Sequence, residues 1–470
     1  MPGHARRMVA ASLATAALAL GVGEAQALRP TEAGHPQSYG GEARYLDSPG
    51  GHVRVWYATE GEHRSPRVAG DGETPEIAET VAEVGDDVFE AMATHGFRLP
   101  LVDSELYPVS ADDGGDERFD IYLINFEAGD GQFVPEYCTT GAPERCAGYA
   151  MLDHAFVPLY YPSRELAVKI VVSHEIFHAV QAAYRADWPV WASEGSASWY
   201  EELVYPEQDD FERLSGYYFE DSARSLNDRA RGPSDGFAYG AGIFFYYLDV
   251  VFGSEMIVAL AERFAASETI EDALQAELAE NFGEADDALE LFAIYNLFTG
   301  ELAGEGEGYP QAERFAGVEV VDLPGEGAFN WEQNVDTFSA RFARWDVKVP
   351  MTLTPVAVEG WPSARLALIR GGQQGTQGYE SVGVGDVVAV GPEDSPVYLV
   401  ASQGLGEDAV ISAQGRLLRE EPQTPSSESS EDGGGGCSQA GGGRTSSVVW
   451  AFLGLCLMGR RVRRRQQWRG

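Results

Sequence analysis

The sequence predicts an α+β protein in which a small sheet, a helical half and a small β-sandwich follow one another. Three observations support this order. Two short apolar runs, 119–126 and 147–156, suit strands of one sheet. Residues 163–298 then carry apolar side chains at helical spacing in several long segments. From about residue 337 to 419 the pattern changes to short alternating runs, which are typical of a β-sandwich.

The composition is strongly acidic. The chain has 470 residues, with 74 Asp and Glu against 33 Lys and Arg, and a formal net charge of −41. A surface this acidic repels phosphate backbones, so we expect no nucleic-acid partner. Hydrophobic residues make up 44% of the chain, which is enough to bury sizeable cores.

The N-terminal end has the pattern of an export signal. Arg6 and Arg7 precede an apolar stretch at 8–22, and Ala25-Gln26-Ala27 supplies small residues at a cleavage site. This order predicts a secretory signal peptide, 1–27, that is removed after Ala27. The alternative is a buried N-terminal helix. An exported chain meets the export machinery and then an oxidising compartment, where Cys138 and Cys146 are expected to form a local disulfide.

The C-terminal end has a different order. A polar linker at 420–436, expected to be disordered, leads to Cys437, an apolar stretch at 446–459 and an arginine cluster at 460–465. The apolar stretch is shorter than the roughly 20 residues of a permanent span. Residues 437–470 resemble the MYXO-CTERM sorting tail of myxobacteria and their relatives. That resemblance implies sorting machinery that processes the chain near Cys437, transient or lipid-mediated membrane association, and delivery to the outer-membrane surface. The alternative is an ordinary C-terminal transmembrane helix.

The elements of the mature chain begin with residues 28–73, an N-terminal edge piece or pro-region that includes one alternating run at 52–57. Thr74-Pro75-Glu76 then opens a helix that Thr74 caps and Gly96 closes. The next helix covers 163–184, and another is expected near 195–204. Apolar periodicity predicts four further helices, at 239–252, 254–266, 270–281 and 285–298.

The helix at 163–184 carries the motif His174-Glu175-Ile176-Phe177-His178. Two histidines four residues apart lie on one helix face and can bind one metal ion. Glu175 beside them suits a general base, as in the HExxH signature of zinc hydrolases. The alternative is a surface helix with exposed polar residues. Apolar neighbours argue for burial instead, and buried histidines need a partner, which Zn²⁺ would supply.

The third ligand is expected in the segment 191–202. Glu194, surrounded by small residues, can approach the metal from a second helix and complete a site of two histidines and one glutamate. Glu201 or Glu202 is the alternative ligand, or orients His174 from behind, unless both lie on a solvated acidic face. Tyr239 is a candidate for stabilising an oxyanion, with a core tyrosine as the plain alternative.

The run Ser193-Glu194-Gly195-Ser196-Ala197 looks like the Asn-Glu-Gly-Phe-Ala block of gluzincin peptidases. Residues from about 53 to 308 resemble a family of secreted metalloproteases common in myxobacteria. The matching pieces are 119–122, 146–149, 174–181, 191–201 and 239–241. The resemblance implies a zincin-like (gluzincin) catalytic domain at 74–310, with Glu194 as third zinc ligand and Glu201 as the later acid of the block. Two departures are the shorter gap between His178 and Glu194, and Ser193 in place of Asn.

The function expected from these residues is that of a secreted or surface-attached zinc metalloendopeptidase that hydrolyses peptide bonds with Glu175 as general base. Protein or peptide substrates would pair with an open edge of the strand at 147–156. The exopeptidase motif Gly-x-Met-Glu-Asn is absent from the sequence. One alternative is a surface-displayed binding or adhesion protein with a structural or degenerate zinc site. Another is a zinc amidase acting on cell-wall peptides.

Overall fold

A computed structural model describes residues 28–418, apart from short gaps at 67–69, 71, 103–105, 107–115, 127–128, 157–160, 208, 230, 232–234, 305–307, 360–362 and 372–377. The described residues belong to one compact unit, which spans Met1–Arg419. The predicted signal peptide with Ala27, the linker at 420–436 and the tail with Cys437 lie outside the described residues. All of the described helices and strands belong to this unit.

The fold is α+β, as predicted, and it starts with a five-stranded sheet. The sheet has the order β1-β2-β3-β5-β4. Its strands are β1 (Ala43–Asp47), β2 (Val53–Ala58), β3 (Phe119–Ile124), β4 (Gly131–Cys138) and β5 (Cys146–Asp153). The three central strands β2, β3 and β5 run parallel, and β1 and β4 are antiparallel strands at the two edges. All six residues of β3 are buried, which agrees with a sequence that is apolar or aromatic except for Asp120.

The position of β5 corrects one expectation. The strand predicted at 147–156 lies between β3 and β4, so it offers no open edge to a substrate. The edge belongs to β4, which the sequence did not reveal because Pro135 and polar residues interrupt its apolar pattern. Proline is tolerated there because an edge strand has one unpaired side. The predicted disulfide between Cys138 and Cys146 is present and joins β4 to β5.

The N-terminal segment at 28–73 is part of this sheet, because it supplies β1 and β2. Arg29 is buried and forms ion pairs with Asp120 on β3, at 2.7 Å, and with Glu136 on β4, at 2.6 Å. Removing one partner from a buried ion pair leaves an uncompensated charge, so this network ties the segment to the sheet. The structure therefore makes this segment part of the sheet, with β1 at one edge.

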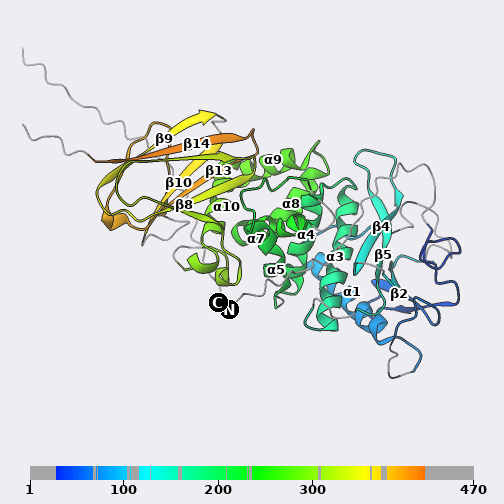
Figure 1. The fold of residues 1–470 in the computed structure, drawn as a ribbon. Helices are drawn as coiled ribbons and strands as arrows, with labels where there is room; N and C mark the ends of the chain where they lie inside the picture. The colour runs from blue at the N-terminus through cyan, green and yellow to red at the C-terminus, as the bar shows by residue number, and fades with distance from the viewer. Residues whose placement is uncertain are drawn as a thin grey trace, which may run out of the picture. The chain divides into compact units, whose positions relative to one another are not determined.

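Two long helices accompany the sheet (Figure 1). The first, α1 (Glu76–His95), has Pro75 rather than Thr74 at its N-cap, so the start predicted from Thr74 is shifted by one residue. It ends as predicted at Gly96, whose φ of 82° suits glycine. The second, α3 (Arg164–Tyr184), begins after Ser163, whose side chain accepts a hydrogen bond from the Leu166 N–H. Its centre is buried on all sides and carries the HExxH motif.

The helical half follows α3. It consists of α4 (Val190–Val204), α5 (Asp210–Phe219), α6 (Phe237–Gly240), α7 (Gly242–Phe252), α8 (Glu255–Phe264), α9 (Ile270–Phe282) and α10 (Ala285–Leu297). Three features differ from prediction: α4 starts five residues before the expected 195, α5 was not foreseen, and the helix expected at 239–252 is divided into α6 and α7. Within the described residues no single helix is long and apolar enough to cross a membrane. One bent pair of helical segments there, 237–252 and 255–264, reaches that length and apolar character when its two parts are taken together.

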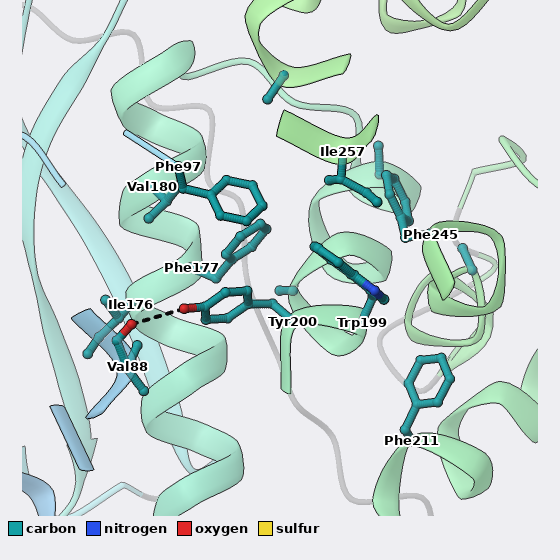
Figure 2. Packing of buried hydrophobic residues seen from close by; sticks show 14 of the residues in the cluster. Val88, Phe97, Ile176, Phe177, Val180, Trp199, Tyr200, Phe211, Phe245 and Ile257 are labelled. Atoms are coloured by element: carbon teal, nitrogen blue, oxygen red, sulfur yellow. Dashed lines mark hydrogen bonds between the residues drawn. The ribbon is translucent and has the colours of Figure 1, made fainter. Parts of the chain in front are cut away.

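An aromatic cluster fixes α4 against α3 (Figure 2). The rings of Phe177 on α3 and Tyr200 on α4 are stacked, with centroids 4.5 Å apart. The Tyr200 hydroxyl also donates a hydrogen bond to the Val88 carbonyl on α1, at 3.0 Å. Three helices thus meet in one core, and this packing sets the position of the α4 residues that face the HExxH motif.

The β-sandwich consists of two mostly antiparallel sheets, with the strand orders β11-β10-β13-β8-β6 and β12-β9-β14-β7. Its strands are β6 (Val320–Leu323), β7 (Phe329–Val335), β8 (Ser339–Trp345), β9 (Met351–Glu359), β10 (Ala364–Arg370), β11 (Tyr379–Ser381), β12 (Val388–Val390), β13 (Val397–Gln403) and β14 (Ala409–Leu417). The expected start at 337 is too late, because β6 and β7 belong to the two sheets. Apolar side chains at the C-terminal end of α10 and just after it, including Ile294 and Phe298, pack against Phe342 and Tyr398 of the sandwich.

Candidate metal centre

His174 and His178 lie one turn apart on the same face of α3, as the HExxH spacing predicts. Their rings are in edge contact, with centroids 4.6 Å apart. Both side chains are buried, because the apolar residues around them pack against the sheet and α4. The two imidazoles are therefore held inside the protein rather than on a surface helix.

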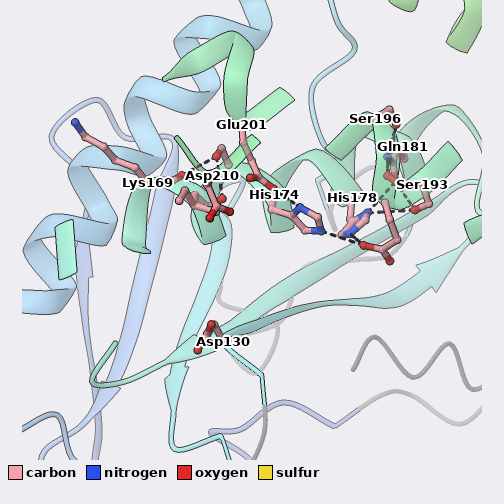
Figure 3. A network of polar contacts seen from close by, with 12 residues as sticks. Asp130, Lys169, His174, His178, Gln181, Ser193, Ser196, Glu201 and Asp210 are labelled. Atoms are coloured by element: carbon pink, nitrogen blue, oxygen red, sulfur yellow. Dashed lines mark hydrogen bonds and ion pairs between the residues drawn. The ribbon is translucent and has the colours of Figure 1, made fainter. Parts of the chain in front are cut away.

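Glu194 reaches these histidines from α4. Its Oε2 atom lies 3.2 Å from His174 Nε2 and 3.7 Å from His178 Nε2. Each of the three side chains offers one ligand atom, and these atoms all lie within 4.8 Å of one another. The structure thus brings together the three residues that the sequence predicts as metal ligands. Figure 3 shows the two histidines among their polar contacts.

The other ring nitrogen of each histidine has an acceptor. Glu201 Oε1 lies 2.6 Å from His174 Nδ1, and Gln181 Oε1 lies 2.8 Å from His178 Nδ1. Glu201 therefore occupies the orienting position predicted for it. Glu202, its alternative, lines a separate pocket with Glu212 and Tyr246 and does not belong to the ligand group.

The donor set fits a divalent metal. Nδ1 of each ring faces an acceptor, which leaves the two Nε2 atoms to converge on a carboxylate oxygen. His178 Nε2 is buried and has no hydrogen-bond partner among the described residues. A buried acceptor without a partner is costly, and a cation between these atoms would satisfy all three at once. Two imidazole nitrogens and one carboxylate leave a fourth position open, which is the ligand set of catalytic zinc sites.

The pKa values of these side chains show the same demand for positive charge. Burial alone would lower the pKa of His174, but Glu194 and Glu201 together raise it well above its usual value. Burial would likewise raise the pKa of Glu194, yet the two histidines hold it far below its usual range. Burial raises the pKa of Glu201 to about 7, although His174 opposes the shift. The two carboxyl groups therefore favour positive charge on or beside the histidines.

Glu175 lies on α3 next to His174, and its side chain meets the edge strand β4. A Cβ atom added at Gly131 of β4 would lie 2.7 Å from Glu175 Cγ, so the strand passes very close to this side chain. Burial raises the pKa of Glu175, and the two histidines and the Phe133 N–H lower it in part. A buried carboxyl with a raised pKa, beside a metal site and under an edge strand, suits proton transfer.

Tyr239, near the end of α6, also lies at the site. Its ring is roughly parallel to that of His174, with centroids 5.9 Å apart. It is 9% exposed. This position agrees with the predicted role beside the metal, and also with packing as a core side chain.

Several residues at the site carry little signal in the sequence. In the sequence, Gln181 stands out only as the last residue of the stretch 174–181 that resembles the metalloprotease family. Its i+3 spacing from His178 nevertheless places it on the same helix face. Gly131 carries no signal, because the strand around it was not predicted. Tyr161 donates a hydrogen bond to Asp130, the residue before Gly131, at 3.3 Å. Tyr161 lies in the loop before α3, where the sequence has no periodic pattern to mark it.

Comparisons with known proteins do not assign a function to this chain. No family model matches the chain, and no curated protein matches it significantly. One similar solved structure is PliG from Aeromonas hydrophila, a periplasmic lysozyme inhibitor of g-type lysozyme, with 17% identity and a TM-score of 0.18, covering 21% of this chain and 96% of that one. Another is PliG from Salmonella Typhimurium, with 7% identity and a TM-score of 0.14, covering 21% of this chain and 97% of that one.

Proposed function

We propose that this protein is an exported zinc-dependent endopeptidase with a gluzincin-type catalytic domain. The observation that carries the proposal is the convergence of His174, His178 and Glu194 beside a buried Glu175 that is not needed as a ligand. A purely structural zinc site uses four protein ligands and has no need of a base beside them. Three ligands with an adjacent carboxyl are what hydrolysis requires.

A zinc ion bound to these three residues would supply Lewis-acid chemistry, which polarises a carbonyl oxygen and acidifies water. The chain's own residues would do the rest. Glu175 would take a proton from the attacking water and give it to the leaving amine. Glu201 would keep the proton on His174 Nδ1, so that Nε2 points to the metal. Tyr239 would donate a hydrogen bond to the developing oxyanion.

The edge strand β4 supports a peptide as substrate. An extended chain can add to an open sheet edge through backbone hydrogen bonds. The Phe133 N–H of β4 interacts with the Glu175 carboxyl, so this part of the edge lies at the proposed catalytic base. A peptide paired along β4 would lie across the site, and its ends need not be recognised. This arrangement favours cleavage within a chain.

The proposed location follows from the two ends of the sequence. A signal peptide ending at Ala27 would export the chain, and a tail processed near Cys437 would place it at the cell surface. The disulfide between Cys138 and Cys146 agrees with an oxidising compartment. Membership of the myxobacterial metalloprotease family is part of this proposal and rests on the motifs of the sequence.

The test is to purify the protein without its signal peptide, measure bound zinc, and measure casein cleavage. We expect one zinc per chain, hydrolysis that a chelator abolishes, and loss of the zinc in Glu194→Ala. Zinc without cleavage of any protein substrate would favour a binding or adhesion protein. Cleavage of cell-wall peptides but not of casein would favour an amidase. If the zinc content of Glu194→Ala is unchanged, another residue must be the third ligand.

A further inference from the structure

We propose that Gln181 is a positioning residue that presets the site for metal, by fixing the proton of His178 and by joining His178 to the segment that carries Glu194. This inference rests on the proposed zinc site and adds a determinant of metal affinity that the HExxH motif does not contain. Gln181 lies on α3, three residues after His178, and its side chain is buried.

Every hydrogen-bonding position of the Gln181 amide is used (Figure 3). Oε1 lies 2.8 Å from His178 Nδ1 and accepts a hydrogen bond from the Ser193 hydroxyl at 2.8 Å. Nε2 donates to the Ser193 carbonyl at 2.8 Å and to the Ser196 hydroxyl at 2.9 Å. A side-chain amide has two donor and two acceptor positions, so Gln181 can form no further hydrogen bond.

These contacts determine the orientation of the amide. The Ser193 carbonyl can only accept a hydrogen bond, so the group that faces it must be the amide NH₂. The opposite atom, Oε1, then faces His178 and can only accept. His178 Nδ1 must therefore carry a proton, which directs the lone pair of Nε2 toward Glu194. This is the nitrogen that has no hydrogen-bond partner among the described residues.

The same amide joins two metal ligands. Ser193 and Ser196 lie on either side of Glu194 in α4, and both bind Gln181. A change in the distance between α3 and α4 near Glu194 would break these bonds, so Gln181 holds His178 and Glu194 at a fixed spacing. Ser193 Oγ lies 3.3 Å from His178 Nδ1, a longer contact that offers only a weaker substitute for the amide.

The test compares zinc affinity, measured by competition with a chelator, in the purified protein and three variants. Gln181→Met keeps the length of the side chain and removes its hydrogen bonds. Gln181→Glu keeps the acceptor for His178 and loses the donor for Ser193. The matched control is Asn296→Leu, because Asn296 is also a buried amide, held by Tyr218 and Tyr309 away from the ligands. The visible spectrum of the Co²⁺-loaded protein reports ligand geometry independently of activity.

We expect Gln181→Met to weaken zinc binding by about 10- to 100-fold and to change the Co²⁺ spectrum, as is typical for partners that orient ligands. Gln181→Glu keeps the acceptor for His178 but loses the donors that reach Ser193 and Ser196, so it should recover only part of the affinity. Asn296→Leu should lower the melting temperature without changing the zinc affinity. Unchanged affinity in Gln181→Met, equal losses in both Gln181 variants, or an equal loss in Asn296→Leu would overturn the inference. An unmodified protein that binds zinc but cleaves nothing would contradict the proposed function and leave this comparison valid.

Discussion

Glu201 Oε1 lies 2.6 Å from His174 Nδ1, and both side chains are buried between α3 and α4. A carboxylate accepts a hydrogen bond, so Nδ1 of His174 carries a proton, and Nε2 is the nitrogen that would bind a metal beside Glu194. The ring nitrogen that His174 offers to a metal is therefore determined by Glu201, which lies 27 positions away in the sequence. The matching contact of His178 is made by Gln181.

Glu201→Gln should weaken zinc binding, since the amide still accepts from His174 but no longer supplies the negative charge that makes the imidazole a stronger ligand. We expect a loss of about 10- to 100-fold in affinity, measured by chelator competition. Glu202→Gln is the matched control, because Glu202 is the next residue of α4 and lies outside the ligand group. Equal losses in the two variants would mean that general acidity, rather than this contact, tunes the site.

Gly131→Ala should lower the turnover rate while leaving zinc bound. The added Cβ would lie 2.6 Å from Val171 Cγ1 and 2.7 Å from Glu175 Cγ, so β4 and Glu175 must move apart. A displacement of this size at a catalytic group costs about 10²-fold in rate. Gly141→Ala is the control in the same hairpin, because a Cβ there meets nothing within 4 Å. Full activity in Gly131→Ala would show that Glu175 does not need this position.

Glu290→Gln should stabilise the protein at pH 8 but not below pH 4.5. Glu290 lies on α10 and accepts a hydrogen bond from Ser381 of β11, and burial raises its pKa from 4.5 to about 7. Because the folded-state pKa lies above the unfolded one, the protonated carboxyl favours folding at low pH, and this stability is lost as the pH rises from 4.5 through 7. The neutral amide avoids that loss, which amounts to about 3 kcal/mol.

Denaturant unfolding of both proteins at several pH values measures this effect. The two curves should coincide at low pH and separate through the range in which Glu290 ionises. A constant difference between wild type and Glu290→Gln at every pH would mean that Glu290 does not titrate in the folded protein.

The sequence predicted those parts of the site that depend on local spacing. Histidines at i and i+4 share a helix face wherever the helix lies, and the apolar residues around them predicted its burial. The sequence did not predict the edge strand, because Pro135 breaks the alternation of β4. The contact between Gly131 and Glu175 depends on that strand, so it could not be predicted either. The contacts of Gln181 with Ser193 and Ser196 depend on how two helices pack, which the periodicity of either helix alone does not determine.

The central claim is that Glu175 is the base of a zinc hydrolase. Its most direct test is the rate of casein hydrolysis by Glu175→Gln, with the bound zinc of the same sample measured alongside. We predict one zinc per chain, as in the wild type, and a rate lower by about 10²- to 10⁴-fold, because the amide cannot accept the proton. Wild-type hydrolysis by a zinc-loaded Glu175→Gln protein would contradict the account.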